Sequence, residues 1–254
     1  MALSMRSRTW ALRMMGCGLL LLSFGFAQAQ PAGRVVELRT AYGTAFNVYQ
    51  TGNDSAKRAV VLVHDRWGLN DSIMQWADRF AAEGYFALAV DLFDGRQALS
   101  GDWRAGDLLI SQADPESSAA NLRAAVRFLN RQSDRKIAVV GWGFGAIEAL
   151  NITLLEPHAI ISSVLFYGPP LTDPERLKPI RGPVLGIYSN RDTWAHPRLI
   201  DAFSWGMQQV RNSLSLIRTD AEPGFMDSSL DAYDEAESQR VMQRTLEFLD
   251  ETLL

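Results

Sequence analysis

The sequence predicts a mixed α/β fold, with a mostly parallel central sheet, helices on both faces and an antiparallel hairpin at the N-terminal edge. Short apolar runs typical of buried strands alternate with longer amphipathic runs typical of helices. Such alternation builds βαβ units, in which consecutive strands lie parallel. The first two strand-like runs, at residues 35–38 and 43–49, have no helical run between them, so we expect them to pair antiparallel.

The remaining elements follow in a regular order along the chain. Three strands are each followed by a helix, in the pairs 59–63 and 72–83, 86–90 and 116–131, and 137–140 and 144–155. Three further strands are expected at 161–167, 184–188 and 214–217, with helices at 198–209 and 234–253. The segment 107–114 is expected to be a loop that caps the pocket or lies on the surface. In open parallel sheets the ligand crevice lies beyond the carboxyl ends of the strands, so the loops there carry the candidate functional residues.

The first 29 residues have the pattern of a secretory signal peptide. Three arginines precede an apolar run at residues 18–26, and Ala27-Gln28-Ala29 forms a small-residue cleavage site. We therefore expect cleavage after Ala29 and a periplasmic or secreted mature protein. Retention of this segment as an uncleaved membrane anchor is the alternative. The only cysteine, Cys17, lies in this segment, so the mature chain is expected to have no thiol nucleophile.

Residues 30–254 are expected to form a single α/β domain. About 225 residues are enough for one large core and too few for two ordinary domains with linkers. The formal net charge is −4, and no basic block is present that could neutralise a phosphate backbone. We therefore expect no nucleic-acid partner, and no stable membrane span after signal cleavage.

A glycine-rich turn between a strand and a helix marks the centre of the candidate site. Residues 139–146 read V-V-G-W-G-F-G-A and match the strand, sharp turn and helix of a G-x-S-x-G nucleophile elbow. Gly143 stands in the nucleophile position, and Gly141 and Gly145 allow backbones to approach closely on either side. Because Gly143 has no side chain, the elbow predicts a pocket without its nucleophile.

Further stretches of the chain carry a resemblance to a known family. They are V-L-V-H-D-R-W-G-L-N at 61–70, A-A-E-G-Y-F-A-L-A-V-D-L-F at 81–93, Arg96-Gln97, I-Y-S-N-R-D at 187–192 and E-P-G-F at 222–225. Together with the elbow, they resemble the dienelactone hydrolase family of α/β-hydrolases over most of the mature chain. The resemblance implies the α/β-hydrolase fold and hydrolysis of a carboxylic ester or lactone.

The resemblance also places a catalytic triad on three positions, of which only the acid is retained. The family pattern has cysteine or serine at 143, aspartate at 192 and histidine at 223, where this chain has Gly143, Asp192 and Pro223. An aspartate orients and stabilises an imidazole, but it does little without one. The backbone N–H groups of Arg66 and Phe144 match the oxyanion-hole donors of the family. The sequence therefore leaves open whether this chain is an enzyme.

Two other positions differ from the family pattern. Asp65 stands where the family has a glutamate that contacts the nucleophile, and the substrate-binding arginine corresponds to Met226 or Asp227. If Asp65 and Asp192 face each other, the pair could activate water or hold a divalent ion. A salt bridge of either carboxylate with a neighbouring arginine, Arg66 or Arg191, is the simpler prediction. No metal site and no cofactor are predicted.

The pocket wall is expected to combine eight residues from the strand-end loops: His64, Asp65, Trp67, Arg96, Trp142, Tyr167, Trp194 and His196. Rigid aromatic rings around one crevice suit a small ligand or a peptide. We expect His64 to be a structural hydrogen-bonding residue and His196 a helix N-terminal residue, with a general base as the alternative for each. His158 is expected on the surface at the opposite end of the sheet. The strand serines Ser162, Ser163 and Ser189 are expected to be unactivated core hydroxyls.

Two functions remain open from the sequence. The first is an exported dienelactone-hydrolase-like protein with a degraded triad, which binds a small molecule or an unknown protein partner without catalysis. The second is a carboxylic ester or lactone hydrolase with displaced catalytic groups, such as Asp65 or Asp192 activating water, or His196 acting as base. A shared fold does not fix function. The simultaneous absence of the nucleophile and the histidine favours the first.

Overall fold

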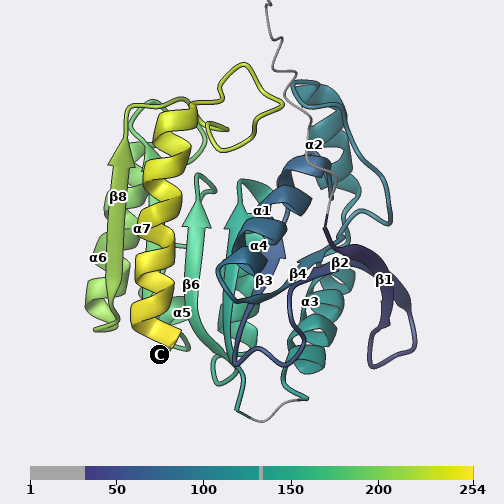
Figure 1. Cartoon of the computed structure of the whole chain (residues 1–254). Helices are drawn as coiled ribbons and strands as arrows, with labels where there is room; N and C mark the ends of the chain where they lie inside the picture. The colour runs from purple at the N-terminus through teal and green to yellow at the C-terminus, as the bar shows by residue number, and fades with distance from the viewer. Residues whose placement is uncertain (1–31, 132–133, 254) are drawn as a thin grey trace, which may run out of the picture. The chain divides into compact units, whose positions relative to one another are not determined.

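A parallel sheet with an antiparallel edge forms the centre of the fold (Figure 1). The computed structural model describes residues 32–131 and 134–253, and the predicted signal peptide lies outside these residues. Within them, the sheet has eight strands in the order β1-β2-β4-β3-β5-β6-β7-β8. Their bounds are β1 Arg34–Arg39, β2 Ala45–Thr51, β3 Arg58–Val63, β4 Phe86–Val90, β5 Lys136–Trp142, β6 Ile160–Phe166, β7 Val184–Ser189 and β8 Leu214–Thr219.

The strand directions agree with the sequence prediction. β1 pairs antiparallel with β2, and β2 pairs antiparallel with β4, whereas all pairs from β4 through β8 are parallel. Every residue of β4 is buried, as are five of the six residues of β3. This continuous burial explains why both strands read as unbroken apolar runs, because helices cover both faces of the sheet there.

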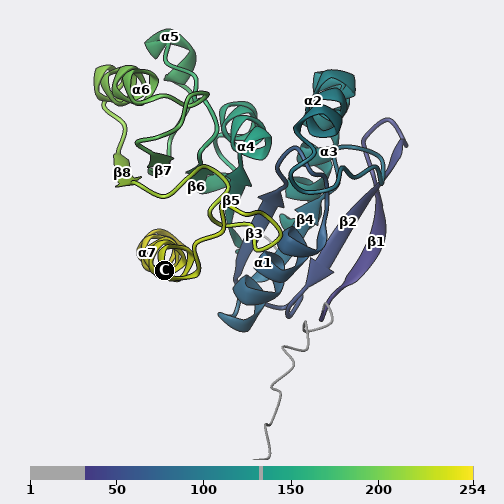
Figure 2. The ribbon, with the colours of Figure 1, turned by 90° about the horizontal axis from the view of Figure 1, so that it is seen from above.

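Helices cover the two faces of the sheet unequally (Figure 2). The helices are α1 Asp71–Ala82, α2 Trp103–Gln112, α3 Pro115–Leu129, α4 Phe144–Leu155, α5 Pro174–Leu177, α6 Pro197–Gln209 and α7 Glu235–Leu253. α1 and α7 lie on one face, and their buried side chains share a core with residues of β3, β5 and β6. α3, α4 and α6 lie on the other face over a second core. The sheet therefore separates two apolar layers.

The segment 107–114 is a helix for most of its length, so the prediction of a loop there was wrong. α2 begins after Asp102, whose side chain accepts a hydrogen bond from Ala105 N at 3.1 Å. Only Gly106 and Leu109 of α2 are buried. α2 is shorter than α3 and α7 and has a glycine in its middle, so its length and helix propensity favour a helix less strongly than theirs do.

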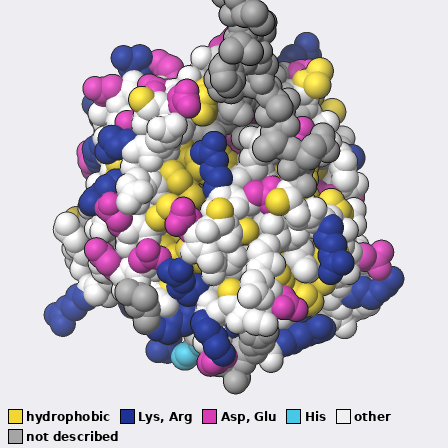
Figure 3. Space-filling view, viewed as in Figure 1, with side chains coloured by type: hydrophobic (Ala, Val, Ile, Leu, Met, Phe, Trp, Pro, Cys, Tyr) yellow, Lys and Arg dark blue, Asp and Glu magenta, His cyan; other side chains and the backbone are white. Residues whose placement is uncertain are grey.

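The face seen in Figure 1 carries Lys and Arg side chains interspersed with Asp and Glu, around a small apolar area (Figure 3). Among the described residues, no helix is long and apolar enough to cross a membrane. The segments that follow β3, β4, β5, β6, β7 and β8 all leave the carboxyl edge of the sheet, because these strands are parallel. The predicted site residues lie in these segments or at the adjoining ends of strands and helices.

Candidate functional site

The glycine elbow has the strained backbone of a nucleophile turn but no side chain. Gly143 joins β5 to α4 with φ +53° and ψ −114°, a conformation that L-residues rarely adopt. Its N–H donates to Phe166 O at 2.8 Å, which fixes the turn against β6. A Cβ on Gly145 would overlap the carbonyl oxygens of Val63 and His64, so only glycine allows this helix to approach β3.

The carboxylate of Asp65 occupies the space above this turn. A Cβ built on Gly143 would overlap the carboxylate group of Asp65. Asp65 Oδ1 accepts a hydrogen bond from Arg66 N at 2.6 Å and another from Phe144 N at 3.1 Å. These are the two donors that the sequence assigns to the oxyanion-hole frame. The structure therefore brings both donors together, and the chain's own carboxylate accepts from both.

Burial makes the ionised form of Asp65 costly. Burial raises the pKa of Asp65 from 3.8 to about 6, and the nearby charge of Asp227 also acts to raise this pKa. The hydrogen bonds from the two backbone N–H groups and the charge of Arg66 oppose this shift. A carboxyl group whose pKa lies near neutrality in a cleft is a typical feature of a functional site.

Asp192 lies on the wall of the same cavity as Gly143 and Pro223. Its Oδ1 accepts hydrogen bonds from Trp194 N at 2.7 Å and Ala195 N at 3.0 Å, which hold the loop after β7. Its Oδ2 is buried and has no hydrogen-bond partner among the described residues. Burial raises the pKa of this carboxyl group. Pro223 stands in the histidine position but has no N–H group to donate. Asp192 Oδ2 therefore has no hydrogen-bond donor from that position.

Arg66 pairs with Asp107 of α2 rather than with Asp65 or Asp192. Its guanidinium lies between two tryptophan rings, 4.9 Å from the centroid of Trp103 and 5.1 Å from that of Trp194. Arg191 likewise pairs with a different residue, Glu222, at 3.0 Å. The predicted salt bridges of the two site aspartates are therefore wrong, because two other acidic residues, Asp107 and Glu222, pair with these arginines.

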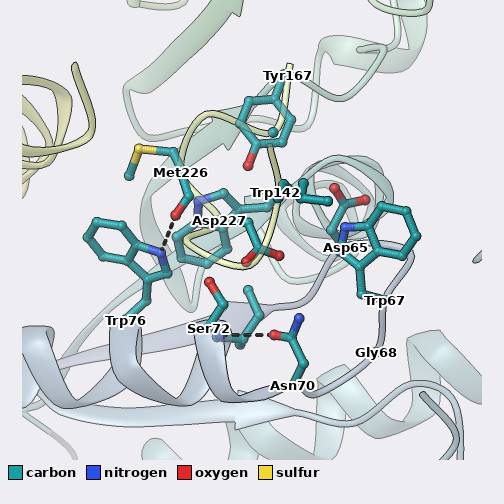
Figure 4. A pocket seen from close by; sticks show the side chains of 13 residues that line it. Asp65, Trp67, Gly68, Asn70, Ser72, Trp76, Trp142, Tyr167, Met226 and Asp227 are labelled. Carbon is teal, nitrogen blue, oxygen red and sulfur yellow. Dashed lines mark hydrogen bonds between the residues drawn. The ribbon is translucent and has the colours of Figure 1, made fainter. Parts of the chain in front are cut away.

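Two adjoining cavities lie at this edge of the sheet. The outer cavity, of about 290 Å³, is lined by Asp65, Arg66, Trp67, Trp103, Gly143, Tyr167, Arg191, Asp192, Thr193, Trp194, Glu222, Pro223, Gly224 and Leu230. The inner cavity, of about 10 Å³, shares Asp65, Trp67, Tyr167, Gly224 and Leu230 with it and also contacts Gly68, Asn70, Ser72, Ile73, Trp76, Trp142, Met226 and Asp227 (Figure 4). The side chain at 65 thus contacts both cavities.

The loop that carries Met226 and Asp227 is fixed to α1. Trp76 Nε1 donates to Met226 O at 3.1 Å, and the Trp76 ring stacks on Trp142 with centroids 6.3 Å apart.

Tyr167, directly after β6, has a positive φ of 39°. Burial raises the pKa of its hydroxyl well above the ordinary value, as do the charges of Asp65 and Asp227.

Three of the predicted pocket residues line neither cavity. His64 is fully buried: its Nε2 accepts from Leu92 N at 3.0 Å, its Nδ1 lies 2.8 Å from Asp65 O, and burial lowers its pKa. His196 is exposed and caps α6, with Nδ1 accepting from Leu199 N at 3.2 Å. Arg96 donates to Phe93 O and to Gln112 Oε1, away from both cavities. These contacts agree with the structural role that the sequence predicts for both histidines.

The other histidine lies far from the elbow, and the three strand serines have structural partners. His158 lies between α4 and β6, at the opposite edge of the sheet from the elbow. Ser163 Oγ lies 2.7 Å from Thr153 Oγ1, Ser162 Oγ accepts from Thr252 Oγ1 at 3.0 Å, and Ser189 Oγ donates to Ala221 O at 2.5 Å. No group of three or more His, Cys, Asp or Glu residues in the described ranges is placed to hold a metal ion.

Sequence reasoning missed Trp103 on the outer cavity and Asn70, Ser72 and Trp76 on the inner one. Trp103 comes from α2, between two βα units, and therefore lies outside the strand-end loops. Asn70 is the N-cap of α1, with its side chain accepting from Ile73 N. The N-D-S sequence before an amphipathic run is a helix-start signal that could have placed this residue at the carboxyl edge.

Comparisons with known proteins agree on one family. The family model described as "Dienelactone hydrolase family" matches residues 46–253. A "Putative carboxymethylenebutenolidase" of Saccharolobus solfataricus is 22% identical, over 82% of this chain and 94% of its own length. The solved structure "m3DLH" is 26% identical with a TM-score of 0.74, covering 87% of this chain and 99% of its own. A dienelactone hydrolase-like promiscuous phosphotriesterase from metagenomic libraries has a TM-score of 0.73 at 19% identity, covering 87% of this chain and 98% of its own. This chain belongs to the dienelactone hydrolase family, and it has the α/β-hydrolase fold.

Proposed function

We propose that this protein is a binding protein built on the dienelactone hydrolase scaffold, with a triad that has lost its nucleophile and its histidine. One observation carries the proposal: Asp65 Oδ1 accepts hydrogen bonds from both oxyanion-hole donors, and its carboxylate fills the space above Gly143. The N-terminal sequence pattern supports export, so the proposed setting is the periplasm or the medium. The ligand is a small molecule that occupies the outer cavity, with a protein partner as the second possibility.

The filled oxyanion hole opposes acyl transfer for two reasons. An ester carbonyl oxygen needs both N–H donors as negative charge develops on it, and each such donor contributes a factor of about 10²–10³ in rate. Here both donors already bind a carboxylate, whose charge would also repel the developing oxyanion. With Gly143 and Pro223 in the triad positions, the chain presents neither an attacking group nor a proton acceptor at these two positions.

The first test is an activity assay on the purified protein. We expect no hydrolysis of p-nitrophenyl acetate or of small enol lactones above the buffer rate, and no labelling by a fluorophosphonate probe, because no activated hydroxyl or thiol faces the hole in the described part of the chain. Asp192→Ala serves as the control, since it removes the retained acid. Turnover by the natural protein that disappears in Asp192→Ala would contradict the proposal.

One observation favours a hydrolase as the second candidate. The pKa of Asp65, about 6, suits a general base that activates water near neutral pH. This candidate predicts an ester or lactone hydrolysis rate that rises with pH through about 6 and is abolished in Asp65→Asn. A pH-independent rate, or full activity in that variant, excludes Asp65 as the base.

A further inference from the structure

The inner cavity has two carboxylates with unused oxygens on its wall. Asp227 is 8% exposed, and its Oδ1 accepts from Ser229 N at 2.9 Å and from Ser229 Oγ at 2.5 Å. Among the described residues, no group donates a hydrogen bond to Asp227 Oδ2 or to Asp65 Oδ2. Figure 4 shows the carboxylates of Asp65 and Asp227 pointing into the cavity, with the hydroxyl of Tyr167 above them. Neither oxygen is fully enclosed, so both can accept hydrogen bonds from solvent or from a ligand that enters the cavity.

Within the described chain, no lysine or arginine lines the inner cavity. Arg66, which follows Asp65 in the sequence, pairs with Asp107. Its guanidinium lies between Trp103 and Trp194 at the outer cavity. Asp65 and Asp227 repel each other across this small space, and the positive charge of Arg66 opposes this repulsion from the wall of the outer cavity. A cation that enters the space relieves this repulsion and regains hydrogen bonds for both oxygens.

The size of the inner cavity limits what can enter. Its volume of about 10 Å³ accommodates one group of the size of a water molecule. An ammonium group has this size and donates three hydrogen bonds, one for each of Asp65 Oδ2, Asp227 Oδ2 and the Tyr167 hydroxyl oxygen. The rings of Trp67 and Trp142 also form part of the wall, and aromatic faces attract cations. A trimethylammonium group is too large, and a carboxylate would be repelled.

The outer cavity is suited to the rest of such a ligand. It adjoins the inner cavity at Asp65 and Tyr167 and has the rings of Trp67, Trp103 and Trp194 on its wall. A volume of about 290 Å³ accommodates an apolar or aromatic group with several carbon atoms. The combination of a polar inner end and an aromatic outer end defines an amphipathic ligand.

We propose that the ligand is a primary amine, whose ammonium group binds Asp65 and Asp227 in the inner cavity while its apolar or aromatic body lies in the outer cavity. This inference rests on the proposed function, since it names the ligand class of a non-catalytic binding site. The resemblance places the substrate-binding arginine of the family at Met226 or Asp227, and the absence of a basic residue at both positions agrees with a pocket that binds a cation.

Calorimetric titration of the purified protein at pH 7.5 tests the inference. The probes are benzylamine and phenethylamine, with benzyl alcohol, trimethylbenzylammonium and benzoate as matched compounds of other head groups. We expect the primary amines to bind at least about tenfold more tightly than each matched compound. Among these probes, only the primary ammonium group both carries a positive charge and donates hydrogen bonds to the two carboxylates. Equal binding of the alcohol or the quaternary ion, or tighter binding of benzoate, overturns the inference.

Two variants locate the binding site, and a third is their control. Asp227→Asn and Asp65→Asn are each expected to weaken amine binding about tenfold or more, since each removes one charge. Asp231→Asn changes an exposed carboxylate in the same loop and should leave the affinity unchanged. Thermal melts of all three verify folding. Unchanged amine affinity in both Asp227→Asn and Asp65→Asn overturns the inference, as does a crystal structure soaked with benzylamine that holds only water in the inner cavity.

The same experiments separate this inference from the proposed function. Tight binding of benzyl alcohol or benzoate in the outer cavity would leave a binding protein with a different ligand class. Ester turnover that depends on Asp192 would refute the binding-protein proposal whatever the result with amines.

Discussion

Replacing Gly143 by serine and Pro223 by histidine is expected to produce no serine esterase unless Asp65 is replaced as well. A side chain at 143 overlaps the Asp65 carboxylate, and both oxyanion-hole donors bind that carboxylate. The sequence alone predicts weak esterase activity for this double variant, because the donors are backbone groups and the acid, Asp192, is present. The structure adds a third requirement, Asp65→Ala, which frees the space and both donors together.

The triple variant Asp65→Ala, Gly143→Ser, Pro223→His is therefore expected to hydrolyse p-nitrophenyl acetate at least about 10²-fold faster than the double variant, the factor associated with one oxyanion-hole donor. Fluorophosphonate labelling, with mass spectrometry of the modified peptide, checks that the serine introduced at position 143 is the acylated residue. This serine costs about 1–3 kcal/mol in stability because of the positive φ at that position, so urea denaturation must accompany the assay.

The matched control keeps the two other changes and places alanine at 143, so that Asp65→Ala, Gly143→Ala, Pro223→His has an open hole without a nucleophile. It should neither label nor form an acyl-enzyme. Equal labelling of the double and triple variants would falsify the conclusion that Asp65 blocks the site.

Asp65→Asn is expected to increase the free energy of unfolding above pH 6 by about 1–3 kcal/mol. Burial raises the pKa of Asp65 from 3.8 in the unfolded chain to about 6 in the folded protein, and each pKa unit corresponds to about 1.4 kcal/mol. Below pH 3.8 the carboxyl group is protonated in both states, so the penalty is absent. As the pH rises through about 6 the folded protein must ionise this partly buried carboxyl group, and the full penalty applies above that pH.

Asparagine keeps an oxygen that can accept from Arg66 N and Phe144 N, but it carries no charge. Urea denaturation at pH 4, 6 and 8 should give a stability difference between Asp65→Asn and the natural protein that is small at pH 4 and largest at pH 8. Asp231→Asn is again the control, since this exposed carboxylate has no buried charge to remove. A stability difference that does not change with pH would show that Asp65 does not titrate in this range.

The sequence predicts the fold well where a segment is buried continuously or along one regular face. The runs that became β3 and β4 are buried along nearly their whole length, and the helix α1 between them buries a clear apolar stripe. α2 and the four-residue α5 were missed because both are short and α2 contains a glycine, which lowers its helix propensity. Expected boundaries differ from the observed ones by a few residues, as at β5, where Gly141 and Trp142 continue the strand.

The sequence by itself determined the order of the elements, the antiparallel edge and the position of the elbow, because apolar period, glycine content and connection length are local properties. The tertiary structure decided what fills the elbow. The placement of the Asp65 carboxylate on the donors of Arg66 and Phe144, the pairing of Arg66 with Asp107 and the shared cavity of Asp65 and Asp227 each join residues from different loops. Such contacts depend on side-chain direction and on the close packing of loops at one sheet edge, which a single sequence does not encode locally.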